Sequence, residues 1–357
     1  MTLECKLHMP VRKILILQEF CFDLDIVYRK MRLPFWEPSG SRIVQKRLRD
    51  MANYTVGALI RDARERQKYS QEELSYGICT PSTLSRIENG MQIPGKRILE
   101  GLLQRLGIVD QIHDVCLSNT EMEQYEMEQH LVRCLGKKEY GKAEQLVNIL
   151  ERTLQKKQRN SYSRSMEEQY LRFARVLIRN NQGQSAQKTL EQFLEVIRIT
   201  IPEFDGLHIK ARLLTFQEIS ILNNIGCSYH AIGRTQDAFL LLFELKEYME
   251  KHPMNGQELS VKYPMILQNL SSWLGQEGYY QDALALCQKG IDFCIEYGKM
   301  HTFPMLLCNK ACALAELGQI EMSKEFFDLS AAVFQAVGQH ERAEQVKKYA
   351  QDYGIVS

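Results

Sequence analysis

Apolar residues recur at the helical period over more than 200 residues, and this spacing limits the possible folds more than any other feature of the sequence. From residue 121 onward, nearly every window has apolar residues at positions i, i+3, i+4 and i+7, the period of one helix face. Strand-like alternation is almost absent, and only nine of the 357 residues are prolines. We therefore predict an all-α chain whose long second part consists of packed helices.

One short pattern occurs three times within this helical region. Each copy begins with an Asn, followed two residues later by a small residue and then by a larger apolar residue. A Gly at an expected helix-helix turn and a second small residue complete the pattern. The second copy begins 45 residues after the first, and the third 40 residues after the second. The first copy comprises Asn224, Gly226, Tyr229, Gly233 and Ala238. Weaker copies lie at 135–146 and 170–190, and a more polar helix follows Gly338. Residues 121–357 are therefore predicted to form helical repeats with a C-terminal capping helix.

Residues 54–110 show a sharper local pattern. Ser70 and Glu73 have the spacing of a capping box, and Gly77 supplies a turn that needs positive φ. Thr80 suits a helix N-cap and precedes a proline at the first helical position. The next helix is expected to end at Asn89 and the glycine that follows it. The pattern predicts helices at 56–68, from residue 70, at 82–88 and at 96–106, with Leu59, Ile60 and Ala63 facing inward.

The run from Ser70 to Gly90 resembles the Cro/repressor-type (XRE) helix-turn-helix family. This resemblance implies a DNA-binding domain at 51–110, followed by a linker at 111–120. In such a domain, side chains near the start of the third helix reach base edges in the major groove. Arg86, one turn further on, either reads a guanine or contacts a phosphate. By family position, Gln71 is expected to meet the DNA backbone or an edge base. Arg64 and Glu88 are expected to join the first and third helices as a structural pair. The base-contacting candidates at the helix start are Pro81, Ser82 and Thr83.

The charge balance limits how one copy of this domain can bind DNA. Lys and Arg total 45 against 44 Asp and Glu, so the formal net charge is +1 and a histone-like binder is excluded. Residues 1–50 have a net charge of +4 and residues 51–110 of +1. Phosphate binding by a nearly neutral domain is weak. We therefore expect a homodimer that binds two half-sites on double-stranded DNA.

The repeats resemble tetratricopeptide arrays, which expose a concave surface built from the first helix of each pair. In peptide-binding members, Asn at the repeated position clamps the peptide backbone, and here that position holds Asn224, Asn269 and Asn309. The alternative is that these residues cap or solvate a helix face. By repeat register, further groove candidates are Met265, Met305, Gln268 and His230, although the methionines suit core packing equally well.

The combination of both parts resembles the peptide-pheromone-responsive regulators of Gram-positive bacteria. This resemblance implies a cytoplasmic regulator whose repeats bind a short imported peptide. Lys210 and Arg212 are possible anchors for the peptide carboxylate, although the sequence does not place them in the groove. The alternative is a regulator whose repeats dock a partner protein.

An enzyme, a cofactor site and a membrane protein are not expected. The sequence has no metal-binding His-Glu motif, phosphate-binding Gly-rich loop or nucleophile elbow. Cys308 and Cys312 are one helical turn apart but lack a second ligand pair, so we interpret them as core-filling thiols. His230 and His301 are expected on helix surfaces. No apolar run approaches the length of a membrane span or a signal peptide.

The first 50 residues differ from the rest, with a break rich in Pro and Gly near residues 34–40 and a basic stretch at 42–50. One hypothesis is that translation starts at Met51, so that residues 1–50 are upstream sequence. The rival hypothesis is a poorly ordered basic arm that contacts DNA or a partner subunit.

Overall fold

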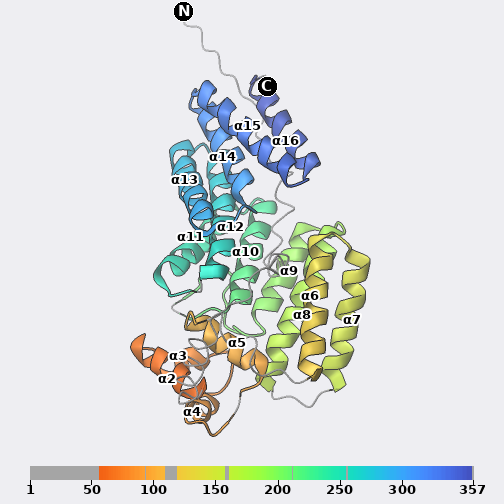
Figure 1. The fold of residues 1–357 in the computed structure, drawn as a ribbon, viewed down its shortest axis with the longest axis vertical. Coiled ribbons are helices and arrows are strands. Elements are labelled where there is room, and N and C mark those ends of the chain that lie inside the picture. The colour runs from red at the N-terminus through yellow and green to blue at the C-terminus, as the bar shows by residue number, and fades with distance from the viewer. Residues whose placement is uncertain are drawn as a thin grey trace, which may run out of the picture. The chain divides into compact units, whose positions relative to one another are not determined.

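The computed structural model describes residues 56–92, 94–108, 119–156, 161–210, 212–254 and 256–355. Within these ranges the chain forms helices and no strand, so the predicted all-α class is confirmed (Figure 1). The predicted extension at 1–50, the start hypothesis at Met51 and residues 111–118 of the predicted linker lie outside the described residues. By its internal contacts the chain divides into two compact units, and the boundary between Leu259 and Ser260 falls inside helix α12.

The first unit begins with a four-helix head. Its helices are α2 (Val56–Arg66), α3 (Gln71–Ser75), α4 (Pro81–Glu88) and α5 (Lys96–Arg105). Apolar side chains from all four helices form one core, which includes Ile60, Leu74, Leu84, Ile87 and Leu102. Leu59, predicted to face inward, is only half-buried. Helix α2 ends two residues earlier than predicted, because the chain turns at Lys68, whose φ is 61°.

The remaining helices of the first unit stack in chain order. They are α6 (Asn119–Gly136), α7 (Tyr140–Lys156), α8 (Ser161–Asn181), α9 (Ala186–Ile197), α10 (Phe216–Ala231) and α11 (Thr235–Lys251). Each of α6 to α9 packs against the next, and α10 packs against α9 and α11 (Figure 1). The head joins this stack through α5, which contacts α8.

The second unit continues the helical repeats from α12 (Gly256–Gln276). It contains α13 (Tyr280–Tyr297), α14 (Phe303–Glu316), α15 (Ile320–Ala336) and α16 (His340–Asp352). Helix α14 packs between α13 and α15, and α16 closes the unit by packing on α14 and α15. The predicted turn glycines, Gly278, Gly318 and Gly338, have φ of 84°, 75° and 75°. The predicted helical repeats are therefore confirmed, and α16 lies at the end of the chain where a polar helix was expected.

None of the described helices is long and apolar enough to cross a lipid bilayer. Among the described side chains, no cluster of three or more His, Cys, Asp or Glu could hold a metal ion. Cys308 is 2% exposed and Cys312 is half-buried, in the apolar core beneath α15 and α16.

Replacing Gly57 by Ala tests the close crossing of α2 and α4. A Cβ atom at Gly57 would lie 1.9 Å from the carbonyl oxygen of Ile87, and a backbone atom cannot move aside without separating the two helices. We expect Gly57→Ala to lower the free energy of unfolding of the head by about 2 kcal/mol or more. Hydrogen exchange of the α4 amides measures this change.

Gly275→Ala in α12 is the matched control, because a Cβ atom there meets no other atom within 4 Å. Removing a helical glycine from open space should raise the free energy of unfolding by about 0.5–1 kcal/mol. Equal effects of the two substitutions would contradict the close crossing.

Candidate DNA-binding and peptide-binding sites

The start of α4 presents the candidate base-contacting residues. Thr80 is the N-cap, its side chain accepts a hydrogen bond of 3.0 Å from the Thr83 amide, and Pro81 is the first helical residue. Pro81, Ser82 and Arg86 are exposed, whereas Thr83 is half-buried and its hydroxyl lies 2.8 Å from the Thr80 hydroxyl. The Ser82 hydroxyl also lies 3.0 Å from the Thr80 hydroxyl, so greater exposure is what places Ser82 and Arg86 better than Thr83 to reach a ligand beyond the helix surface.

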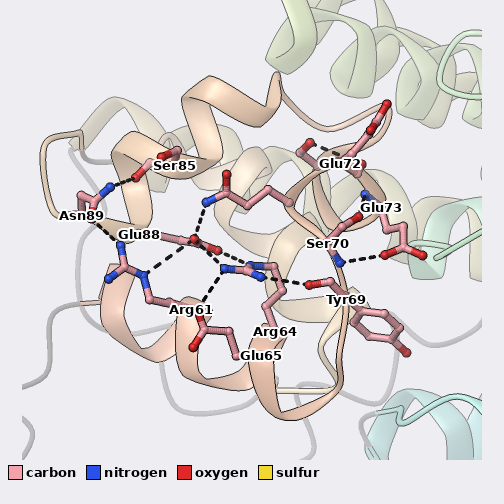
Figure 2. Close-up of polar contacts among 12 residues, drawn as sticks. Arg61, Arg64, Glu65, Tyr69, Ser70, Glu72, Glu73, Ser85, Glu88 and Asn89 are labelled. Atoms are coloured by element: carbon pink, nitrogen blue, oxygen red, sulfur yellow. Dashed lines mark hydrogen bonds and ion pairs between the residues drawn. The ribbon is translucent and has the colours of Figure 1, made fainter.

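A buried carboxylate, Glu88, joins three of the head helices at the end of α4 (Figure 2). Its side chain is fully buried and accepts hydrogen bonds of 2.7 and 3.0 Å from Arg64 of α2. Gln71 of α3 donates a further bond of 2.7 Å. The hydrogen bond to Glu88 raises the pKa of the Arg64 guanidinium. Because one carboxylate satisfies donors from both other helices, it fixes the orientation of α4 relative to α2 and α3.

The contact with Glu88 changes the expectation for Gln71. One N–H of the Gln71 amide is used inside the head, and an amide group has two such donors. A phosphate contact would therefore use the second N–H, while Glu88 holds the amide in place. This contact between Gln71 and Glu88 was not predicted from the sequence.

A second buried ion pair connects the head to the repeats within the first unit. Arg105, the last residue of α5, lies 3.6 Å from Glu218 of α10, and both side chains are 1% exposed. Arg105 also donates to the backbone carbonyls of Leu74 and Tyr76, at the end of α3. Burial lowers the pKa of the Arg105 guanidinium, which nearby Glu218 opposes. The turn between α3 and α4 is thus tied to the start of α10.

The loop between α9 and α10 contacts the same turn. Glu203 accepts hydrogen bonds from the Tyr76 hydroxyl and from Arg212, whose guanidinium lies 4.4 Å from the centre of the Tyr76 ring. Although partial burial opposes ionisation, these hydrogen bonds lower the pKa of Glu203 to about 2. A Cβ atom at Gly77 would lie 2.5 Å from the Thr200 carbonyl oxygen, so only glycine permits this approach.

The two possible carboxylate anchors lie in this loop and are paired within it. Arg212 pairs with Glu203, and Lys210 lies 3.8 Å from Asp205. Lys210 has a φ of 45°, which is uncommon for a residue with a side chain.

In the first unit, the candidate peptide-binding residues lie on a helix that is buried on nearly all sides. Asn224 is 7% exposed, and its amide donates a 2.8 Å bond to the Ser220 carbonyl one turn earlier. His230 is 8% exposed, so the expectation that it lies on a helix surface is wrong. Burial lowers its pKa to about 4.

In the second unit, the candidates contribute to packing between helices. The Asn309 amide donates to the Gln268 carbonyl and to the Ser271 hydroxyl, at 2.9 and 3.0 Å, and so joins α14 to α12. Asn269 is 5% exposed. Met265 and Met305 are each 8% exposed, and Met305 belongs to the core beneath α15 and α16. The Gln268 side chain is half-buried. His301, expected on a surface, is also half-buried.

Sequence reasoning missed the contacts between the head and the repeats, although one signal was available. Thr215 and Glu218 have the capping-box spacing, and the structure shows both capping hydrogen bonds. This spacing marks the start of α10. It does not show that Arg105, more than 100 residues away, meets the same carboxylate.

The buried His230 predicts a specific dependence of stability on pH. Its folded pKa of about 4 lies below the usual histidine value of 6.5, so the unfolded chain takes up the proton first as the pH falls. Stability from the neutral ring is therefore complete above pH 6.5 and is lost between pH 6.5 and about 4. Between pH 7.5 and 4.5, wild type should lose about 2 kcal/mol more than His230→Gln. Urea unfolding at both pH values checks this difference, and parallel losses would refute it.

The chain is similar to known proteins both in the sequence of its head and in its three-dimensional structure. The helix-turn-helix family profile matches residues 60–110, which comprise most of α2 and all of α3, α4 and α5. No curated protein sequence matches the chain.

Three solved structures cover most of the chain at low identity. PlcR from Bacillus thuringiensis, in complex with the peptide PapR7 and DNA, is 18% identical, covers 82% of this chain and 98% of its own, and gives a TM-score of 0.51. ComR from S. thermophilus, in complex with DNA and its signalling peptide ComS, is 16% identical, with coverage of 84% and 99% and a TM-score of 0.47. The SHP pheromone receptor Rgg2 from Streptococcus dysgalactiae is 15% identical, with coverage of 83% and 98% and a TM-score of 0.43.

At 18% identity, the likeness to PlcR shows a shared fold. Together with the family match and the observed helix pairs, it defines the architecture. Residues 60–110 are an XRE-type helix-turn-helix domain, and the chain combines this domain with tetratricopeptide-like repeats in the fold of PlcR.

Proposed function

We propose that this protein is a sequence-specific transcription regulator that acts in the cytoplasm as a homodimer and binds a short signalling peptide through its repeats. The observation that carries the proposal is the head itself, in which α4 is fixed by Glu88 and presents Ser82 and Arg86 at an exposed surface. PlcR, which shares the fold, was solved with both a peptide and DNA.

The head is suited to DNA because its recognition elements are held rigidly before binding. Cap and ion-pair contacts fix α4, so little ordering is needed when it enters a major groove. Pro81 has no side-chain donor, and the hydroxyls of Ser82 and Thr83 both lie within hydrogen-bond distance of the Thr80 hydroxyl, which leaves few groups for direct base readout. We infer that one head binds weakly and that a dimer on two half-sites supplies the affinity.

Arg86→Ala tests the role of α4. An operator is first selected from random duplexes with the full chain, and binding is then measured by anisotropy at several salt concentrations. If Arg86 reads a guanine, the variant should bind the operator about 10- to 100-fold more weakly and lose its preference at one base pair. A loss that is equal on all sequences would instead make Arg86 a phosphate contact.

Arg66→Ala is the charge-matched control, because Arg66 is also exposed but lies in the last turn of α2. We expect at most a uniform loss of affinity with a smaller salt dependence. If the full chain selects no sequence, the proposed regulator function fails.

The peptide site is proposed on the first helices of the repeats. Asn309 is the testable residue, because it is half-buried, whereas Asn224 and Asn269 are buried. Its amide nitrogen already donates to α12, so its carbonyl oxygen is the atom that would accept a peptide N–H.

A pool of random short peptides, followed by mass identification of retained peptides, tests this site. A peptide at 100 times its dissociation constant should stabilise the chain by about 2.7 kcal/mol. We expect Asn309→Ala to reduce this stabilisation, measured against the variant without peptide, because the substitution also removes two internal hydrogen bonds.

Lys310→Ala is the control for the peptide experiment, since Lys310 is the adjacent residue and bonds the Gln288 side chain. It should retain the full peptide effect. If no peptide stabilises wild type, peptide sensing fails, and a repeat domain that docks a partner protein becomes the favoured function.

A further inference from the structure

Helix α15 carries a row of exposed apolar side chains. Met322 and Leu329 are each 46% exposed, and Val337, just beyond the helix, is 54% exposed. Ala332, which lies between Leu329 and Val337 in the sequence, and Ala336, which precedes Val337, are also exposed. Residues seven apart lie on the same side of a helix after two turns, so Met322, Leu329 and Ala336 form one continuous strip.

The repeat fold does not require an apolar strip at these positions. When the helices are aligned on their shared small residue (Ala238, Ala283 and Ser323), the strip positions can be compared directly. They hold only charged residues in the other two helices: Asp237, Glu244 and Lys251 in α11, and Asp282, Lys289 and Glu296 in α13. The apolar strip is therefore a property of α15 and not of the repeat.

We propose that α15 is a self-association surface, on which α15 of a second copy packs antiparallel about a two-fold axis at Leu329. Equal spacing on both sides of Leu329 makes the strip self-complementary in this arrangement. Met322 of one copy faces the small Ala336 of the second copy, seven residues from the axis in each chain. The half-buried Phe326 likewise faces Ala332 of the second copy. Large side chains thus meet small ones, as close helix packing requires.

The charges of α15 favour the antiparallel direction. All of its charged residues (Glu321, Lys324, Glu325 and Asp328) lie in its first half, and residues 329–336 have none. Antiparallel packing places each acidic half against the uncharged half of the other copy. Parallel packing would place the two acidic halves side by side, which is unfavourable. The antiparallel direction also opposes the helix dipoles.

This inference rests on the dimer in the proposed function and assigns it a surface. The two ideas can fail separately. A dimer through α15 without sequence-specific DNA binding would leave this inference standing and refute the regulator. Specific DNA binding by a chain whose dimer does not depend on α15 would refute this inference and leave the regulator function standing.

The test compares the mass of the full chain with that of Met322→Glu/Leu329→Glu, by sedimentation velocity at about 50 µM chain. We expect wild type at twice the chain mass of 41.5 kDa and the double variant at the chain mass. Burying unpaired carboxylates should weaken the dimer by about 100-fold or more. Both substituted side chains are exposed in one copy, so thermal unfolding of the monomer should be little changed.

Ile149→Glu is the matched control. Ile149 of α7 is 45% exposed and occupies the same repeat position as Leu329, but the position of Met322 is taken there by Lys142. This variant should remain a dimer. A monomeric wild type, or a double variant that remains dimeric, would overturn the proposal.

A mixing experiment tests the axis. If two copies of residue 329 face each other, Leu329→Glu and Leu329→Lys should each self-associate weakly but recover a dimer when mixed. No recovery on mixing would overturn the assigned register.

Discussion

The buried pair of Arg105 and Glu218 is the interaction on which the first unit depends, because it withdraws two opposite charges from water between the head and the repeats. Such burial is tolerated only if both groups find partners. Arg105 donates through Nη1 to two carbonyls at the end of α3, whereas its buried Nε has no hydrogen-bond partner, and Glu218 caps α10 and accepts from Thr200. The pair and its partners come from four segments, namely α3, α5, the α9–α10 loop and α10. The pair therefore forms only when the head and this loop are both folded.

The same principle organises the inside of the head at Glu88. A carboxylate with no exposed side-chain surface gathers donors from α2 and α3, and the exposed start of α4 is held as a consequence. Of the two buried carboxylates, Glu88 orients α4, and Glu218 is linked through Arg105 to the residues at the end of α3. A continuous set of polar contacts therefore connects the start of α10 to this turn.

The repeats conserve size at the positions where helices touch and vary the residues at the exposed strip positions. The positions that let helices approach closely keep small residues, as at Gly226, Ala283 and Ser323. The positions of Met322, Leu329 and Ala336 vary between repeats, and only α15 among the three compared helices has apolar residues at these positions. A symmetric arrangement of large and small residues on such a strip is a requirement for packing against a second copy, not for the stability of a single chain.

The sequence by itself determined the features that depend on a few neighbouring residues. Helical spacing gave the class, the Ser70–Glu73 box and Thr80 gave helix starts, and positive-φ glycines gave turns, because these signals act within about four residues along the chain. Apart from the pair of Arg64 and Glu88, which the family resemblance implied, tertiary structure alone decided which distant polar groups meet. It placed His230 in the interior and directed the Asn309 amide across to α12. It also joined Arg105 to Glu218, since burial and pairing over long separations depend on how helices pack, which local spacing does not specify.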